Sequence, residues 1–536
     1  MWNFHHRLLT VVVALVGADA PAVGQTALPT LRIDAPASLE AVAERVGRFP
    51  LSHLTTAMTL AGLTRAGPPI DVLLIAESSD LARSTPPWIS GFADAGRNLV
   101  VLLPNRARSY PSDSLETLLH HEVAHILFAR AAQGRPVPRW FNEGLALAAE
   151  RPVIVVGQGV RYGGAAGELL TLAERLQVPV AASASGLGAL PVEHPLSLGL
   201  VQRGGTYQAN HSCRQADVLL ALGVRFDDRT SSSWLPGYSF TIPPTKLIHV
   251  DIDPEEIGRN YPVALGLMAD VRTFLRQVIG ELDRREHHTG PTEANRKWLA
   301  KIETYRAKWD EFVAPGMTDD ATPINPQRAA VEIDKALPED AILVSDIGVH
   351  HNWLLQFCKP SRPDSLIGSM GFGPMGFGVG GVLGAKLAAP DRPAVSVCGD
   401  GAFFMHANVL GTAVEYDIPA VWVVWNNHAY ASIRGLQRGY LENRELATDF
   451  HHPETGEPYT PDFAAMARSA GVEGVRIDKP GDLGDAIQTG IASGKPYLID
   501  AHIGGDLNPP GAGVWELPGI GINSPAIGER YDPDHS

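Results

Sequence analysis

Cysteine is scarce in this sequence. The 536 residues include only Cys213, Cys358 and Cys398, and no C-x-x-C pair occurs. Three well-separated cysteines cannot pair completely, so a disulfide scaffold and a zinc ribbon are excluded. Aromatic residues are also few, at 7%, whereas apolar residues make up 45% and charged residues 19%. This composition is that of a folded globular chain, not of a disordered, collagen-like or coiled-coil chain.

Basic residues are outnumbered and never clustered. The 44 Lys and Arg residues against 59 Asp and Glu residues give a net charge of −15. No Lys/Arg-rich run is present, so we expect no nucleic-acid partner. All nine lysines follow residue 245, a weak sign that two parts of the chain differ in origin. No charge-free apolar run reaches the roughly 20 residues that cross a bilayer, so we expect no membrane span.

The first 25 residues have the pattern of an export signal. His5, His6 and Arg7 precede an apolar run over residues 8–18, and small residues follow it. A basic start, a short apolar centre and a small-residue end predict a signal peptide over residues 1–25. A buried N-terminal helix is the alternative.

The remainder of the chain divides into blocks of alternating apolar runs and helical stretches. In the first block, residues 70–76 and 99–103 are predicted strands and residues 114–132 a predicted helix. The later blocks contain strand-like runs such as VIVVG, VLLALG, AVSVCGDG and AVWVVWNN. The predicted organisation is a small α+β domain over residues 26–150, a middle domain over 151–285, a linker over 286–325 with a helix near 298–312, a further α/β domain over 326–505 and an irregular tail over 506–536.

A zinc-binding pattern lies in the first block. His121 and His125 form an H-E-x-x-H motif, whose i, i+4 spacing places both imidazoles on one helix face. Glu122 would stand beside a metal-bound water, and Glu143, in the segment WFNEG, is the candidate third ligand. This block resembles the gluzincin-type zinc metallopeptidases, although the resemblance stops near Glu150. A helix with surface histidines is the alternative.

A second pattern indicates a diphosphate and a magnesium ion. Gly399, Asp400 and Gly401 follow one apolar run, and Asn426 and Asn427 follow the next. Asp400 and Asn427 offer the hard oxygen ligands that Mg²⁺ prefers. Glycines allow backbone N–H groups to approach phosphate oxygens.

Residues 151–520 resemble the middle and C-terminal domains of thiamine diphosphate-dependent enzymes of the acetolactate synthase group. The resemblance rests on ERPVIVVGQGV, ALGVRFDDR, HVDIDPEEIGRN, SDIGVHHNW and GFGPMGFG, together with the G-D-G and N-N pair. It implies a multidomain α/β fold, with two doubly wound parallel-sheet domains after the small α+β domain. It also implies Mg²⁺ held by Asp400, Asn427 and the Ala429 carbonyl.

The same resemblance assigns the cofactor contacts. Gly401 and Ala402 would face the diphosphate of thiamine diphosphate, with Gly399 and Asn426 beside it. His350 matches a histidine of the diphosphate turn, and Met375 stands where a residue props the cofactor into its bent shape. In the middle domain Arg225, Asp251 and Asp253 could meet a flavin nucleotide such as FAD; a domain that keeps the fold without the flavin is the alternative. Val349, Pro374, Ser432 and Arg434 depart from the family pattern and leave the 2-oxo acid substrate open.

One part of the family's active site has no counterpart in the sequence. The family uses an N-terminal pyrimidine-binding domain, whose glutamate hydrogen-bonds the aminopyrimidine ring. Glu122 is too close to Arg151 for that role, because a compact domain needs more than the 28 residues between them. We therefore expect a homo-oligomer, or a partner that supplies the pyrimidine-binding domain.

These patterns predict a thiamine diphosphate- and Mg²⁺-dependent carboligase or decarboxylase of 2-oxo acids that could be inactive alone. The alternatives are an exported zinc metallopeptidase and a non-catalytic fusion of two gene fragments. The localisation stays open, because the thiamine part implies the cytoplasm and the N-terminal segment implies export.

Overall fold

A computed structural model shows the fold. It describes residues 28–54, 58, 63, 65–85, 90–106, 115–131, 150–235, 237–284, 293–505 and 509. The predicted signal segment, the WFNEG segment with Glu143 and nearly all of the predicted tail lie outside the described residues. Within the described part of the chain, no helix is long and apolar enough to cross a membrane.

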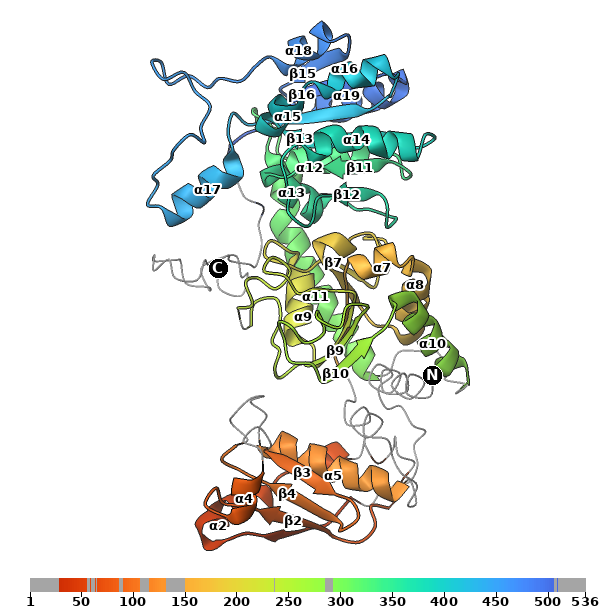
Figure 1. The fold of residues 1–536 in the computed structure, drawn as a ribbon, viewed down its shortest axis with the longest axis vertical. Coiled ribbons are helices and arrows are strands. Elements are labelled where there is room, and N and C mark those ends of the chain that lie inside the picture. The colour runs from red at the N-terminus through yellow and green to blue at the C-terminus, as the bar shows by residue number, and fades with distance from the viewer. Residues whose placement is uncertain are drawn as a thin grey trace.

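The N-terminal unit is a four-stranded sheet with helices packed on it (Figure 1). The sheet order is β1-β2-β4-β3, with β3 antiparallel to β4 and the other pairs parallel. Its elements are β1 (Leu31–Asp34), η1 (Ala37–Leu39), α2 (Glu40–Val46), η2 (Leu51–His53), β2 (Ile70–Leu74), α4 (Asp80–Ser84), β3 (Gly91–Asp94), β4 (Leu99–Leu102) and α5 (Leu115–Ala131). The two predicted strands and the predicted helix are therefore present, and α5 buries Leu119, Val123 and Leu127 in the core of this unit.

The middle domain is a six-stranded, wholly parallel sheet in the order β10-β9-β8-β5-β6-β7. Its strands are continuous apolar runs because helices cover both faces. Its elements are β5 (Pro152–Val156), α7 (Gln158–Tyr162), α8 (Ala166–Leu176), β6 (Val180–Ala182), η3 (Ala184–Gly186), β7 (Ser197–Leu200), α9 (Tyr207–Gln215), β8 (Val218–Leu222), β9 (Lys246–Asp251), β10 (Leu265–Met268) and α10 (Val271–Arg284).

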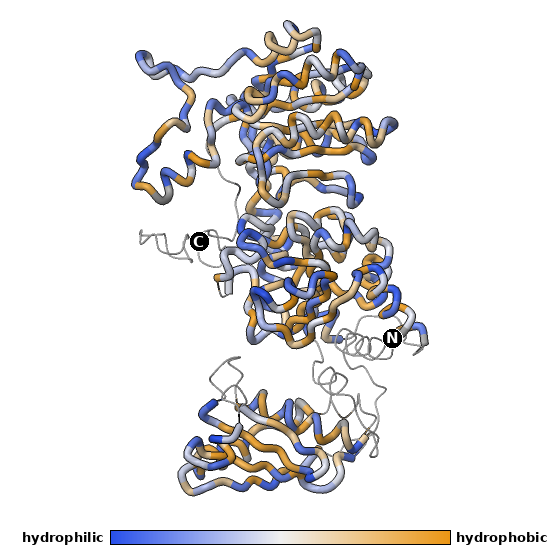
Figure 2. The backbone as a smooth tube through the Cα atoms, in the orientation of Figure 1, coloured by the Kyte–Doolittle hydropathy of each residue, from blue (hydrophilic) through white to orange (hydrophobic). Residues whose placement is uncertain are grey.

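The C-terminal domain has a second parallel sheet, in the order β12-β11-β13-β14-β16-β15. Figure 2 shows the hydrophobic residues concentrated along the strands of each domain. Its elements are α12 (Pro326–Ala336), β11 (Ile342–Ser345), α13 (Val349–Phe357), β12 (Leu366–Gly368), α14 (Phe377–Ala388), β13 (Ala394–Gly399), α15 (Asp400–His406), α16 (Val409–Glu415), β14 (Val421–Asn426), α17 (Ala431–Tyr440), α18 (Phe463–Ser469), β15 (Glu473–Ile477), α19 (Pro480–Ser493) and β16 (Tyr497–His502). The predicted pair of doubly wound domains is confirmed.

The predicted linker helix is longer than expected and belongs to the core. It is α11 (Glu293–Met317), and its buried face carries Trp298, Tyr305 and Trp309. Trp298 Nε1 donates to the carbonyl of Pro152 at 3.2 Å, at the start of the first middle-domain strand. The large aromatic side chains recur at helical spacing among polar residues and so form one buried face. The segment is polar on average, and this average polarity hides the buried face.

Side chains tie the middle and C-terminal domains together. Arg229 Nη2 donates to Asn352 Oδ1 at 2.7 Å, and Arg161 Nη2 donates to the Leu366 carbonyl at 2.9 Å. Residues of both domains share one hydrophobic cluster. The middle and C-terminal domains therefore share part of their hydrophobic core.

A close backbone contact closes the centre of the middle sheet. Gly223, at the end of β8, has φ +59°, and a Cβ there would lie 2.6 Å from the Gly159 Cα. The Gly159 N–H donates to the Gly223 carbonyl at 3.3 Å. Only a residue without a side chain fits this turn.

Replacing that glycine tests the contact. We expect Gly223→Ala to lower the free energy of unfolding by about 2–5 kcal/mol, from left-handed strain and overpacking. The matched control is Gly280→Ala in α10, where nothing lies within 4 Å of the added Cβ; it should be neutral or stabilising by up to about 1 kcal/mol. Denaturant titration of both variants measures the difference, and equal stabilities would contradict the contact.

Candidate active site

Polar residues follow three neighbouring strands of the C-terminal sheet. Asp346 follows β11, Asp400 follows β13 and Asn427 follows β14. Because the three strands are adjacent and parallel, their carboxyl ends meet at one edge of the sheet. Ligands of open α/β sheets bind at this edge.

A cavity of about 280 Å³ opens at that edge. It brings together seven of the predicted site residues of this domain and the Ala429 backbone. The lining residues are Ile347, Gly348, Val349, His350, Gly373, Met375, Gly399, Asp400, Gly401, Ala402, Trp425, Asn427, Ala429, Tyr430, Ala431, Ser432 and Ile433. Asn426 is not among them, because its side chain is buried below the cavity and donates to Asp500 Oδ1 at 2.9 Å.

Asp400 is a buried carboxylate at the floor of this cavity, 2% exposed. Its Oδ1 accepts from the Gly401 N–H at 2.7 Å and its Oδ2 from the Asn427 N–H at 3.2 Å. Burial raises the pKa of Asp400 to about 7, although these amides oppose the shift. A carboxylate whose pKa burial raises despite its backbone donors favours a cation beside it.

Gly401 is required by its neighbour. A Cβ at this position would lie 2.3 Å from Tyr430 Cε1. Tyr430 packs its ring edge-on against Phe450, with centroids 4.7 Å apart. The glycine therefore keeps the backbone of the predicted diphosphate turn close to the loop that follows β14.

His350 contributes a buried nitrogen to the cavity. It lies in the first turn of α13, is 2% exposed, and its Nε2 has no hydrogen-bond partner among the described residues. Desolvation lowers the pKa of His350 to about 4, against the opposing charge of Asp346. An unsatisfied buried polar atom on a residue that lines a cavity is a sign of a ligand that completes its bonding.

Asp346 is a structural residue that the sequence analysis did not single out. It is fully buried, and its carboxylate accepts from the backbone N–H groups of Ile347 at 2.7 Å, Gly376 at 3.0 Å, Gly378 at 2.8 Å and Val379 at 3.3 Å. These bonds cap α14 and fix the loop that carries Met375. The available signal was an aspartate directly after a buried strand, a position shared with Asp400.

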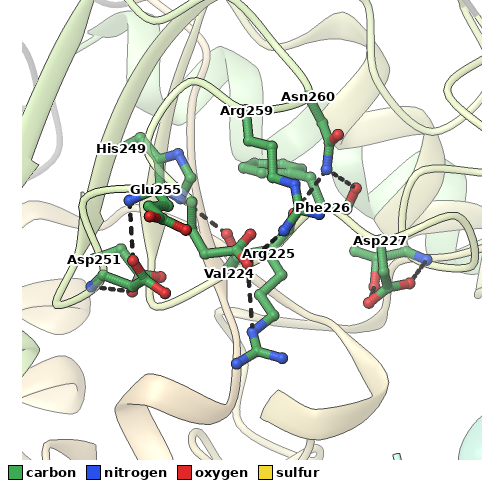
Figure 3. Close-up of polar contacts among 12 residues, drawn as sticks. Val224, Arg225, Phe226, Asp227, His249, Asp251, Glu255, Arg259 and Asn260 are labelled. Carbon is green, nitrogen blue, oxygen red and sulfur yellow. Dashed lines mark hydrogen bonds and ion pairs between the residues drawn. The ribbon is translucent and has the colours of Figure 1, made fainter. Parts of the chain in front are cut away.

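Two of the predicted nucleotide residues of the middle domain, Arg225 after β8 and Asp251 at the end of β9, are drawn in Figure 3. The Arg225 guanidinium is 63% exposed and lies 4.0 Å from Glu256 Oε1. Asp251 accepts from the Asp253 N–H at 3.0 Å. The structure thus places Arg225, Asp251 and Asp253 at one sheet edge.

The two histidines of the H-E-x-x-H motif converge on α5. Their Nε2 atoms lie 3.0 Å apart, with ring planes at 84°. Glu122 and His125 are 6% and 8% exposed. Glu143 lies outside the described residues, and among those that are described no group of three His, Cys, Asp or Glu side chains is placed to hold a metal ion.

Comparison with known proteins agrees with the parallel-sheet domains. Residues 145–278 match the family described as "Thiamine pyrophosphate enzyme, central domain". Residues 346–501 match "Thiamine pyrophosphate enzyme, C-terminal TPP binding domain".

Three relatives extend the comparison. The chain is 36% identical to the "Probable acetolactate synthase large subunit" of Methanocaldococcus jannaschii, over 66% of this chain and 58% of that protein. It is 32% identical to the acetolactate synthase large subunit of Parasynechococcus marenigrum, over 69% of this chain and 58% of the relative. It is 33% identical to the acetolactate synthase isozyme 3 large subunit of Escherichia coli, over 67% and 60%. The chain thus spans about three fifths of the length of these relatives.

The fold is that of an α/β protein with a cavity at the carboxyl edge of a parallel sheet, where such proteins bind ligands. More specifically, residues 145–278 and 346–501 belong to the thiamine pyrophosphate enzyme family, in its acetolactate synthase-like branch. No comparison bears on the zinc-peptidase resemblance of the first block.

A second buried histidine, His351, makes stability depend on pH. Its Nδ1 lies 2.9 Å from Ser345 Oγ, and burial, with the nearby charge of Arg229, lowers the pKa of His351 to about 3. The unfolded chain binds a proton there below about pH 6.5, whereas the folded chain does not. The contribution of neutral His351 to the free energy of unfolding is therefore fully present above pH 6.5 and is lost as the pH falls toward 3.

We expect His351→Asn to remove this pH dependence. Between pH 7 and pH 5 the wild-type protein should lose about 2 kcal/mol more of its unfolding free energy than the variant. Denaturant titrations at both pH values measure the two losses. Parallel losses would show that His351 is not buried in its neutral form.

Proposed function

We propose that the chain binds thiamine diphosphate with Mg²⁺ and acts on 2-oxo acids as a carboligase or decarboxylase. The observation that carries the proposal is the convergence of Asp400, Asn427, Gly401 and His350 on one cavity at the carboxyl edge of the sheet. The names of the relatives favour acetolactate synthase-like chemistry, in which two 2-oxo acid units are joined.

The cation would be held by oxygen atoms. Asp400 and Asn427 offer side-chain oxygens, and Ala429 a carbonyl, around the same cavity. This hard-oxygen set fits Mg²⁺. The raised pKa of Asp400 describes a carboxylate that gains from a neighbouring positive charge, since a divalent cation favours its ionised form.

The diphosphate would lie along Gly399, Gly401 and Ala402 and would offer a hydrogen-bond partner to His350 Nε2. The remaining walls are apolar, from Val349, Met375 and Ile433, and keep water from the reacting end of the cavity. Thiamine diphosphate, when bound, supplies the electron sink for cleavage beside the 2-oxo acid's carbonyl. The chain's own residues bind the cofactor, orient it through Met375 and exclude solvent.

A second protein surface would complete the site. The matched regions are the central and C-terminal domains, and the glutamate that would contact the aminopyrimidine ring is not among the cavity residues. We propose that a pyrimidine-binding domain from another chain provides it. We also propose that a flavin nucleotide binds in the middle domain, in contact with Arg225, Asp251 and Asp253.

Asp400→Asn tests the cofactor site. We expect wild-type protein to bind thiamine diphosphate only with a divalent cation, and the variant to bind at least about 100-fold more weakly, because a cation ligand has lost its charge. Quenching of the tryptophan fluorescence, to which Trp425 in the cavity wall contributes, reports binding. Asp482→Asn, at an exposed position of α19, is the control and should bind normally. Equal affinities for wild type and Asp400→Asn would remove Asp400 from the site.

We also propose zinc binding by the N-terminal unit, as a separate second function. The 3.0 Å approach of the His121 and His125 Nε2 atoms favours it, because two ligands of one tetrahedral Zn²⁺ lie about 3.3 Å apart. With Glu143 as third ligand, an open position would remain for the water that Glu122 deprotonates in peptide hydrolysis.

Metal analysis of the purified protein tests this second function. We expect wild-type protein to contain one equivalent of zinc that His121→Ala lacks, since two remaining ligands hold zinc weakly. His194→Gln, in the middle domain, should leave this zinc in place. A zinc content unchanged by His121→Ala would contradict the assignment.

A further inference from the structure

The carboxyl edge of the C-terminal sheet continues past the cofactor cavity. The strand order runs from β14 to β16 and then to β15. His428 lies two residues after β14, His502 ends β16, and Asp478 directly follows β15. Three neighbouring strands thus place two imidazoles and a carboxylate in a row beside the cavity.

The two imidazoles point their Nε2 atoms at each other. The His428 Nε2 to His502 Nε2 distance is 3.3 Å, with ring planes at 80°. Zn–N bonds of about 2.0–2.1 Å at a tetrahedral angle place two ligand nitrogens about 3.3–3.4 Å apart. The observed separation matches that of two nitrogens bound to one ion.

The other ring nitrogens have partners of the kind found behind metal ligands. His502 Nδ1 lies 3.2 Å from Asp478 Oδ1, so it donates its proton there and leaves a lone pair on Nε2. His428 Nδ1 lies 3.2 Å from Thr460 Oγ1, which accepts from Asn426 Nδ2 at 3.1 Å and lies 3.3 Å from Asn426 Oδ1. If Thr460 donates to Asn426, His428 also presents a lone pair. Carboxylate–histidine–metal chains have this arrangement.

We propose that His428 and His502 bind a divalent transition metal of the zinc class, with Asp478 orienting His502. Imidazole nitrogens suit zinc, cobalt and copper, whereas the oxygen set of Asp400 and Asn427 suits Mg²⁺, so the two sites select different ions. Two protein ligands leave two tetrahedral positions for water. The side chains of His502 and Asp478 are 23% and 49% exposed, which gives the ion a route from solvent.

The metal would act on the neighbouring loop. His428 has φ +57° and lies between Asn427 and Ala429, the predicted Mg²⁺ ligands. An ion bound by both His428 and His502 would link His428, whose backbone is in the left-handed conformation, to the end of β16. The bound ion would therefore stabilise the loop without entering the cofactor cavity.

The alternative is a direct hydrogen bond. If Thr460 instead donates to His428 Nδ1, His428 Nε2–H can donate to His502 Nε2, and no ion is needed. Metal binding separates the two arrangements, because only one of them loses a metal when His502 is replaced.

Equilibrium dialysis of the full chain against Co²⁺, with excess Mg²⁺ present, measures the bound equivalents. We expect His502→Gln to bind one Co²⁺ fewer than wild type, and the absorption of the lost ion in the visible range to disappear with it. Sites elsewhere in the chain, including that of His121, cancel in this difference. His452→Gln, an exposed histidine of the same domain, should bind as wild type does.

Asp478→Asn provides a second variant on the surface that leaves both ligands in place. We expect it to weaken this one Co²⁺ by about 10–100-fold, as loss of an outer-shell partner does. Equal Co²⁺ equivalents in wild type and His502→Gln, or an unchanged affinity in Asp478→Asn, would overturn the proposal. Neither result depends on thiamine diphosphate binding, which is measured separately.

Discussion

The parallel pairing of the six C-terminal strands is the constraint on which the site depends. Because every strand runs the same way, each loop that follows a strand starts at the same edge. Asp346, Asp400 and Asn427 therefore meet there although they come from segments far apart in the chain. An antiparallel strand between β11 and β14 would have moved one of them to the opposite edge.

Two buried aspartates at that edge, Asp346 and Asp400, have different roles. Asp346 has four backbone N–H donors, so its charge is satisfied inside the protein and holds two loops in place. Asp400 also has backbone N–H donors, from Gly401, Asn427, His428 and Ala429, yet burial still raises its pKa to about 7. Asp346 is not among the cavity residues and holds the surrounding loops, whereas Asp400 lines the cavity, where a cation can reach it.

Local spacing explains what could be predicted from sequence. The i, i+4 spacing of His121 and His125 brings their side chains together in any helix. The G-D-G and N-N pair requires only two consecutive parallel strands. Both arrangements can therefore be predicted from local secondary structure. The extent of α11 was underestimated, because its packing against α9 and α12, and not a local preference, buries its aromatic face. The role of Asp346 could not be predicted from local spacing, because most of its hydrogen-bond partners lie about 30 residues away, in a glycine-rich loop.

The approach of His428 and His502 could not be read from the sequence for a topological reason. The chain leaves β14, forms β15 at the outer edge, and only then returns to place β16 between them. The two histidines are 74 positions apart, and the segment between them carries no periodicity that encodes this insertion. Register completes the arrangement, since Asn426 pairs with His502 across the sheet. A one-residue slip of β16 would turn the His502 side chain to the other face and separate the imidazoles, so the same register that fills the core also sets the distance between their nitrogens.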